Sequence, residues 1–187
     1  MATPALSTPT AARERLRAVV RDESFLYGRF TLSSGRPANY FLDMKPTMLD
    51  PEGANLIADL MLEAIGKEPV DAVGGLAAGC IPIVTLVAAR SFHSAHPIAG
   101  FFVRKEPKGH GTNKLIDGNL EPGMRVVLVE DVTTTGQSVM RAVHEARRIG
   151  CKVERVVTVV DRLEGAEENL RREGIELIAL FNRDEFR

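Results

Sequence analysis

The sequence has little of several features that mark special classes of protein. Of its 187 residues only Cys80 and Cys151 are cysteines, and both stand among apolar neighbours. We therefore expect two buried free thiols and a reducing, cytoplasmic compartment rather than a disulfide framework. No window approaches 18 uninterrupted apolar residues, and the first residues lack the basic start and apolar core of a secretory signal. No membrane span is expected.

The chain also lacks an excess of charge of either sign. The formal net charge is −1, so the overall balance gives no reason to expect a nucleic-acid or membrane partner. No zinc-ligand spacing occurs, and no Gly-Lys-Ser/Thr follows a glycine-rich loop, which disfavours nucleoside triphosphate hydrolysis. With 44% hydrophobic and 26% charged residues, the composition is that of an ordinary globular protein. We expect a disordered tail over residues 1–10 and one domain over 11–187.

The chain opens with a pattern that differs from the rest. Apolar residues at helical spacing predict a helix over 11–22. Two short strand-like pieces, 30–32 and 40–42, then flank the turn-forming residues 34–37. We expect a small N-terminal lobe or hood, mainly residues 11–49, that is separate from the main sheet.

From Asp50 onward helices and strands alternate. Asp50 and Pro51 predict the start of a helix that ends near Ile65. Apolar strands are predicted over 70–73, 98–103, 125–129, 153–160 and 175–180, and helices over 81–90, 136–149 and 165–173. This order predicts an α/β fold with a mostly parallel central sheet flanked by helices. Ligands bind at the carboxyl ends of such strands, which draws attention to the loops 74–79, 104–118, 130–138 and 161–162.

The loop 130–138 after the strand 125–129 combines acids, hydroxyls and glycine. Its residues are Glu130, Asp131, Val132, Thr133, Thr134, Thr135, Gly136, Gln137 and Ser138. Free N–H groups at the start of the next helix, with the threonine hydroxyls, predict a pocket for a dianionic phosphate. The two adjacent acids need hydroxyl donors or a cation, and a ribose near Mg²⁺ would supply both. The alternative is an acidic strand end with an ordinary threonine cap.

The segment 104–118 is rich in lysine, glycine and asparagine, and we expect it to be mobile. Arg104, Lys105, Lys108 and His110 fall within its first seven residues. Such a loop could close over a departing pyrophosphate, stabilise the growing negative charge and exclude water. A solvated hairpin is the alternative.

These motifs resemble those of a known family. The strand followed by Glu-Asp-Val-Thr-Thr-Thr-Gly resembles the phosphoribosyl-pyrophosphate-binding motif of type I phosphoribosyltransferases. The pattern Arg-Lys-x-x-Lys-x-His-Gly is similar to the flexible catalytic loop of the orotate phosphoribosyltransferases. The resemblance implies that Arg104, Lys105, Lys108 and His110 contact pyrophosphate, with Lys108, His110 and Asp131 as the catalytic residues. It also implies a homodimer whose loop reaches the neighbouring site.

The base would be recognised elsewhere. Arg162, after the strand 153–160, could pair with the carboxylate of orotate, although an ion pair with Glu164 or Asp161 is the alternative. The resemblance adds Thr134 as an orotate contact and residues 31–43 as a hood over the base. Two departures stand out, because many relatives carry lysines where this sequence has Ser33 and the pair Ala77 and Ala78.

Together these features predict an enzyme that joins orotate to the ribose 5-phosphate of phosphoribosyl pyrophosphate, giving orotidine 5′-monophosphate in pyrimidine biosynthesis. Mg²⁺ would be held by Asp131, substrate oxygens and water. A phosphoribosyltransferase for a purine or for uracil is the nearest alternative. A regulator that senses phosphoribosyl pyrophosphate without catalysis is another, but the residues before the hood are too few and too neutral for a nucleic-acid-binding module.

Overall fold

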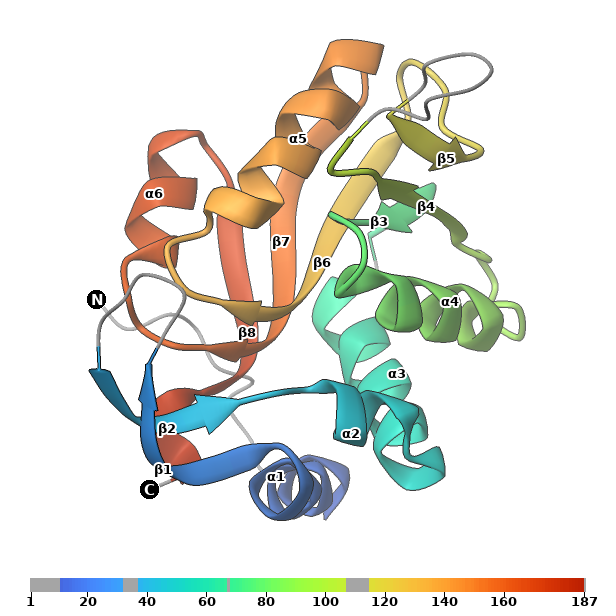
Figure 1. Cartoon of the computed structure of the whole chain (residues 1–187). Coiled ribbons are helices and arrows are strands. Elements are labelled where there is room, and N and C mark those ends of the chain that lie inside the picture. The colour runs from blue at the N-terminus through green and yellow to red at the C-terminus, as the bar shows by residue number, and fades with distance from the viewer. Residues whose placement is uncertain (1–10, 32–36, 67, 107–114, 187) are drawn as a thin grey trace.

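The computed structural model describes residues 11–31, 37–66, 68–106 and 115–186. Its centre is a six-stranded sheet with the order β5-β4-β3-β6-β7-β8 (Figure 1). Five of these strands are parallel, and β5 runs antiparallel to β4 at one edge. The strands are β3 (Ala72–Gly74), β4 (Ala99–Val103), β5 (Ile116–Gly118), β6 (Arg125–Thr133), β7 (Lys152–Asp161) and β8 (Glu176–Asn182). The predicted α/β fold class is confirmed.

Helices cover both faces of the sheet because the central strands are apolar on both sides. In β6, Val127 and Val129 belong to the hydrophobic cluster on one face, and Val126 and Leu128 to the cluster on the other. The first face is covered by α3 (Pro51–Ile65) and α4 (Cys80–Ser91), the second by α5 (Gln137–Ile149) and α6 (Ala166–Arg172) (Figure 1). The alternation leaves the carboxyl ends of the strands as the place where polar side chains collect.

The N-terminal hood has its own small sheet. Strands β1 (Phe25–Thr31) and β2 (Pro37–Leu42) form an antiparallel hairpin, next to α1 (Ala11–Glu23) and the short α2 (Lys45–Leu49). The hairpin packs through aromatic rings, with Phe25 stacked on Tyr40 at 4.9 Å between centroids and on Phe186 at 5.6 Å. Phe186 belongs to the final 3-10 helix η1 (Arg183–Phe186). The hood therefore rests on the C-terminal end of the domain.

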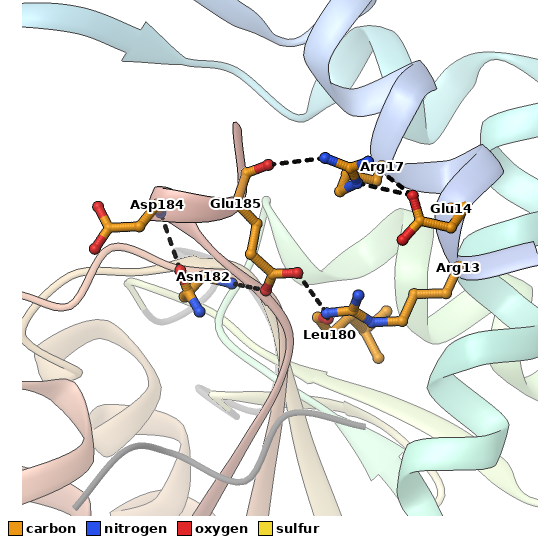
Figure 2. A network of polar contacts seen from close by, with 7 residues as sticks. All are labelled: Arg13, Glu14, Arg17, Leu180, Asn182, Asp184 and Glu185. Carbon is orange, nitrogen blue, oxygen red and sulfur yellow. Dashed lines mark hydrogen bonds and ion pairs between the residues drawn. The ribbon is translucent and has the colours of Figure 1, made fainter. Parts of the chain in front are cut away.

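Charged contacts fasten α1 to the same C-terminal turn (Figure 2). Arg13 is only 6% exposed, and its guanidinium donates to Leu180 O at 2.9 Å and to the Glu185 carboxylate at 2.7 Å. It also lies 4.6 Å from the centroid of the Phe181 ring. Arg17 donates to the backbone oxygen of Glu185 at 3.2 Å. Because the pair of Arg13 and Glu185 is largely buried, losing one partner would strand a charge.

Several boundaries differ from those expected. The predicted helix start is confirmed, since the Asp50 carboxylate accepts from Gly53 N at 2.8 Å. By contrast β6 continues to Thr133 and β8 to Asn182, beyond the expected ends at Val129 and Leu180. Both strands end in a polar residue, Thr133 and Asn182, for which apolar patterning gives no signal, although the added Val132 and Phe181 are apolar. The elements α2, β5 and η1 were not expected, being three to five residues long.

Two expectations from composition concern the whole chain. Cys80 and Cys151 are free and buried, as predicted. Among the described residues no helix is long and apolar enough to span a bilayer. The expected tail, residues 1–10, lies outside the described residues.

Candidate active site

The phosphate loop, defined as residues 133–136, joins β6 to α5. Gly136 caps α5 with φ of +80°, a left-handed conformation that favours glycine. The first turn of α5 therefore begins after Thr133, Thr134, Thr135 and Gly136, and the N–H groups of that turn have no partner within the helix. A cavity of about 100 Å³ lies here and is lined by Glu130, Val132, Thr133, Thr134, Thr135, Gly136, Gln137, Ser138 and Val139. This is room for one phosphate-sized group rather than a whole substrate.

Neighbouring residues hold the phosphate loop in shape. The Thr133 hydroxyl donates to Asp161 Oδ1 at 3.0 Å, and the N–H of Arg162 donates to Thr133 O at 2.9 Å. Asn169 of α6 donates to Thr135 O at 2.8 Å. Burial raises the pKa of Asp161, while the hydrogen bond from Thr133 lowers it. A loop fixed by three hydrogen bonds from one side is preorganised to bind an anion.

The sequence predicted Glu130 and Asp131 in the loop after the strand. The structure places both within β6. Glu130 is 8% exposed, and its Oε2 atom has no hydrogen-bond partner among the described residues. Burial first, and then the charge of Asp131, raise the pKa of Glu130 to about 8. A buried carboxylate oxygen without a partner is costly. The site therefore suits a ligand that brings hydroxyl donors or a cation to Glu130.

Asp131 has a different setting. Burial raises its pKa, while a hydrogen bond from Val132 N at 2.9 Å opposes this, as does the charge of Lys45. A Cβ atom on Gly79 would lie 3.0 Å from Asp131 Oδ1, so the loop before α4 passes close to this carboxylate. Lys45, at the start of α2, was not among the predicted site residues. Its sequence neighbours gave no signal, because the hood and β6 approach only in the folded chain.

The glycine-rich loop 74–79 lies against β6. A Cβ atom on Gly75 would be 2.4 Å from Val129 O, so the close approach requires glycine. The peptide between Ala77 and Ala78 is cis. The Ala77 N–H donates to Val103 O at 2.8 Å, which ties the loop to the end of β4. Ser33, the other departure from the family, lies outside the described residues.

The cationic segment is described only at its two ends. Arg104 follows β4, and its guanidinium pairs with Asp117 and lies 5.6 Å from the centroid of the Phe102 ring. Lys105 is exposed, and its charge lowers the pKa of Glu130, so it lies on the side of the acidic pair. Its backbone oxygen accepts from Arg141 of α5 at 2.9 Å. Lys108 and His110 lie outside the described residues, and β5 occupies the last three residues of the predicted loop, Ile116–Gly118.

Arg162 follows β7 directly, as the sequence indicated. Its Nε donates to the Tyr40 hydroxyl at 3.2 Å, and its guanidinium carbon lies 5.2 Å from the centroid of the Tyr40 ring. Its Nη2 is paired with Glu164 at 2.8 Å. The ion pair considered from the sequence therefore exists in the folded chain. These partners occupy Nε and Nη2 of the guanidinium, and among the described residues Nη1 makes no hydrogen bond or ion pair, so a carboxylate could approach Nη1.

A second, larger cavity of about 500 Å³ lies beside the phosphate loop. It is lined by Asp161, Leu163, Gly165, Glu167, Glu168 and Arg171. Three carboxylates and one guanidinium make a poor lining for an anionic substrate. The smaller cavity at the phosphate loop is therefore the better candidate, because its lining is rich in hydroxyls and N–H groups.

Comparison with known proteins agrees with this geometry. A model of the phosphoribosyl transferase domain matches residues 47–182. Over 181 residues the chain is 45% identical to an orotate phosphoribosyltransferase of Rhodopseudomonas palustris, covering 95% of this chain and 97% of the relative. An orotate phosphoribosyltransferase of Sorangium cellulosum is 42% identical over 177 residues, covering 93% and 92%.

Solved structures show the same likeness. The orotate phosphoribosyltransferase of Mycobacterium tuberculosis H37Rv, in complex with Fe(III) dicitrate, superposes with a TM-score of 0.83 at 39% identity, covering 94% of this chain and 98% of that one. The same enzyme in complex with phosphoribosyl pyrophosphate gives a TM-score of 0.79 at 36% identity, with the same shares of the two chains. Such identity over nearly the full length of both partners decides the family. The chain belongs to the orotate phosphoribosyltransferase family.

Proposed function

We propose that the protein transfers the 5-phosphoribosyl group from phosphoribosyl pyrophosphate to orotate, giving orotidine 5′-monophosphate and pyrophosphate in pyrimidine biosynthesis. Family membership supports the reaction class. The observation that carries the proposal is the contact between Arg162 N and Thr133 O at 2.9 Å. This contact places Arg162, the proposed partner of the orotate carboxylate, next to the phosphate loop. Transfer between orotate and phosphoribosyl pyrophosphate requires these two sites to be adjacent.

The residues of this chain act mainly by position and charge. The 5-phosphate of the ribose would bind at the phosphate loop, with the N–H groups of α5 and the threonine hydroxyls as donors. The ribose hydroxyls would donate to Glu130 and Asp131. Arg162, with Thr134, would hold orotate so that its N1 attacks C1 of the ribose with inversion, while pyrophosphate leaves from the opposite side. As the N1–C1 bond forms and the C1–O bond to pyrophosphate breaks, the N1 proton of orotate passes to water or to the departing pyrophosphate, and orientation dominates the rate.

Arg104, Lys105, Lys108 and His110 are proposed to bind the departing pyrophosphate. The positions of Arg104 and Lys105 support this. Arg104 follows β4 at the carboxyl edge of the sheet, and the charge of Lys105 lowers the pKa of Glu130. Positive charge near the leaving group stabilises the negative charge that develops on it. The roles of Lys108 and His110 rest on the family resemblance.

Mg²⁺ is the proposed cofactor. Burial of Glu130 with an unpartnered oxygen, next to Asp131, fits a cation or the hydroxyls of a cation-bound ribose. Within the described residues no group of three acids, histidines or cysteines converges, so substrate oxygens and water would complete the ligand set, with Asp131 as the main protein ligand. When bound, the ion would neutralise charge on the pyrophosphate.

Three further proposals concern organisation. A homodimer in which the cationic segment serves the neighbouring site follows from the resemblance to the family. A cytoplasmic location is supported by the two free, buried thiols. A single domain over residues 11–187, with residues 11–49 as its hood, is supported by the contacts of α1 and β1 with η1.

One assay tests the proposed function. The protein, Mg²⁺ and phosphoribosyl pyrophosphate are mixed separately with orotate, uracil, adenine or hypoxanthine, and release of pyrophosphate is followed. We expect rapid release with orotate alone. Release with a purine or with uracil instead would assign the chain to another base, and binding without release in every mixture would indicate a sensor of phosphoribosyl pyrophosphate.

A further inference from the structure

The last strand of the sheet, β8, brings a cation to the carboxyl edge. Strand β8 ends at Asn182, which is paired with Asp161 at the end of β7. Arg183 follows β8 as Arg162 follows β7. The two arginines therefore leave neighbouring parallel strands at the same edge. Nothing in the proposed function uses Arg183.

The two arginines share their acceptors. Glu164 Oε1 lies 2.8 Å from Arg162 Nη2 and 3.9 Å from Arg183 Nη1. The Tyr40 hydroxyl accepts from Arg162 Nε at 3.2 Å, and Tyr40 also raises the pKa of the Arg183 guanidinium. Two cations thus converge on one carboxylate and one hydroxyl. All these side chains are at least partly buried, so their charges are screened less than surface charges.

The cluster also holds Asp161, which is 2% exposed and whose pKa is raised by burial and lowered by the charge of Arg183. Glu164 is the carboxylate that Arg162 and Arg183 share. Asp184 lies 3.6 Å from Arg183 Nε, but its side chain is 51% exposed and so is well screened. Beyond this ion pair, Arg183 Nε is buried and makes no hydrogen bond to a described residue.

We propose that Arg183 is a specificity-determining residue for orotate: it shares Glu164 with Arg162, so that Glu164 does not neutralise Arg162 alone and the Arg162 guanidinium keeps charge to bind one substrate carboxylate. Arg162 then remains paired with Glu164 and still binds an anion. This inference rests on the proposed function. Uracil, which has no carboxylate, would leave the charge unmatched.

The C-terminal turn holds Arg183 in place. Glu185 Oε1 accepts from Asn182 N at 3.0 Å, and its other carboxylate oxygen pairs with Arg13 (Figure 2). Arg17 binds the backbone of the same residue. These contacts hold the short 3-10 helix η1 on both sides. They keep the guanidinium of Arg183 near Arg162, with the Arg183 side chain 28% exposed.

The first experiment compares single variants by steady-state kinetics with both substrates. Arg183→Gln should raise the KM for orotate by about tenfold, since a charged partner is lost, and should change the KM for phosphoribosyl pyrophosphate by less than about twofold. Arg183→Lys keeps the charge and should stay within about threefold of the wild type. Arg148→Gln, which removes an exposed arginine of α5 paired with Glu145, is the matched control. Thermal unfolding checks that each variant is folded.

The second experiment restores the charge. In Glu164→Gln/Arg183→Gln the carboxylate that would neutralise Arg162 is removed together with Arg183. The double variant should have a lower KM for orotate than Arg183→Gln and lie within about threefold of the wild type. A merely structural role for Arg183 would make the double variant no better than the single one.

The outcomes separate this inference from the proposed function. If the wild type releases no pyrophosphate with orotate, the proposed function itself fails. If the wild type is active but Arg183→Gln keeps the orotate KM within twofold, or the double variant is no better than Arg183→Gln, the inference about Arg183 alone is wrong. A selective loss in Arg183→Gln that the double variant repairs supports it.

Discussion

The phosphate side and the base side of the candidate active site are built in different ways. The phosphate side is one continuous stretch, residues 130–138, in which strand, turn and helix start follow one another. The base side gathers Tyr40 from the hood, Arg162 and Glu164 from the loop after β7, and Arg183 from η1. The first is set by local backbone geometry, and the second depends on how the hood and the C-terminal turn pack.

This difference has a physical consequence. Donors supplied by the backbone at a helix start are present whenever the helix forms, so the phosphate side should tolerate changes elsewhere. Side chains brought together from distant segments depend on every contact between those segments. The base side should therefore be the more easily altered of the two, in mutants and in evolution of substrate choice.

The largest expected effect comes from the cationic segment, which belongs to neither the phosphate side nor the base side. Lys108→Ala should lower kcat by about tenfold to a thousandfold, because one charge that stabilises the leaving pyrophosphate is removed. The KM for orotate should change little, since the base side is intact. Steady-state kinetics measures both. Lys152→Ala, an exposed lysine at the opposite end of the sheet, is the control. Unchanged turnover would remove the cationic segment from the mechanism.

Removing the central arginine sharpens the comparison between the two sides. Arg162→Ala should raise the KM for orotate by about tenfold to a hundredfold, as expected for loss of a charge-assisted hydrogen bond. The KM for phosphoribosyl pyrophosphate should change far less, because the Arg162 contact to Thr133 O is made by the backbone. Equal losses for both substrates would show that the two sides are not independent, and would contradict the carboxylate role.

The acidic pair gives a prediction about pH and stability. Glu130 has an ordinary pKa of 4.5 and a folded value of about 8, raised by burial and then by Asp131. Between these values the folded state binds more protons than the unfolded state, so the free energy of unfolding falls as pH rises through this window. The loss is on the order of a few kcal/mol.

Glu130→Gln should remove most of this pH dependence in the ligand-free protein. Its Tm should exceed that of the wild type by several degrees at pH 8 and approach it near pH 5. Thermal unfolding across this range measures the difference. Parallel Tm curves for wild type and variant would mean that Glu130 is not held in its neutral form by the fold.

The smallest expected effect concerns the support of the phosphate loop. Asn169→Ala removes the hydrogen bond to Thr135 O and should raise the KM for phosphoribosyl pyrophosphate by about twofold to tenfold. The KM for orotate should stay near its starting value. Asn55→Ala removes a bond of the same kind and length, to Pro51 O, far from the site and is a matched control. If both variants behave alike, the loop does not need this support.

The sequence allowed the phosphate side to be predicted but only part of the base side. Residues 130–138 are adjacent, so acids, threonines and Gly136 could be recognised together before their geometry was known. Arg162 was found because it follows an apolar strand. Glu164 was considered as its ion-pair partner because it lies two residues away. Tyr40 and Lys45 could not be assigned to their contacts, since the partners lie 122 residues apart in the case of Tyr40 and Arg162.

Arg183 was missed for a more instructive reason. Apolar patterning ended the last strand at Leu180, whereas β8 continues through Phe181 to Asn182. The two extra residues bring Arg183 to the carboxyl edge of the sheet, where the rule for parallel strands would have drawn attention to it. A cation directly after the last strand of an α/β sheet is the signal that could have found it.

The contact between Arg13 and Glu185 joins positions 172 residues apart. So large a separation in sequence makes this a non-local contact, and α1 can dock only on a fold that already includes β8 and η1. Tyr40 lies beside Arg162 only when the hood has docked. Residues 130–138, by contrast, are adjacent in the sequence, so their arrangement does not depend on that docking.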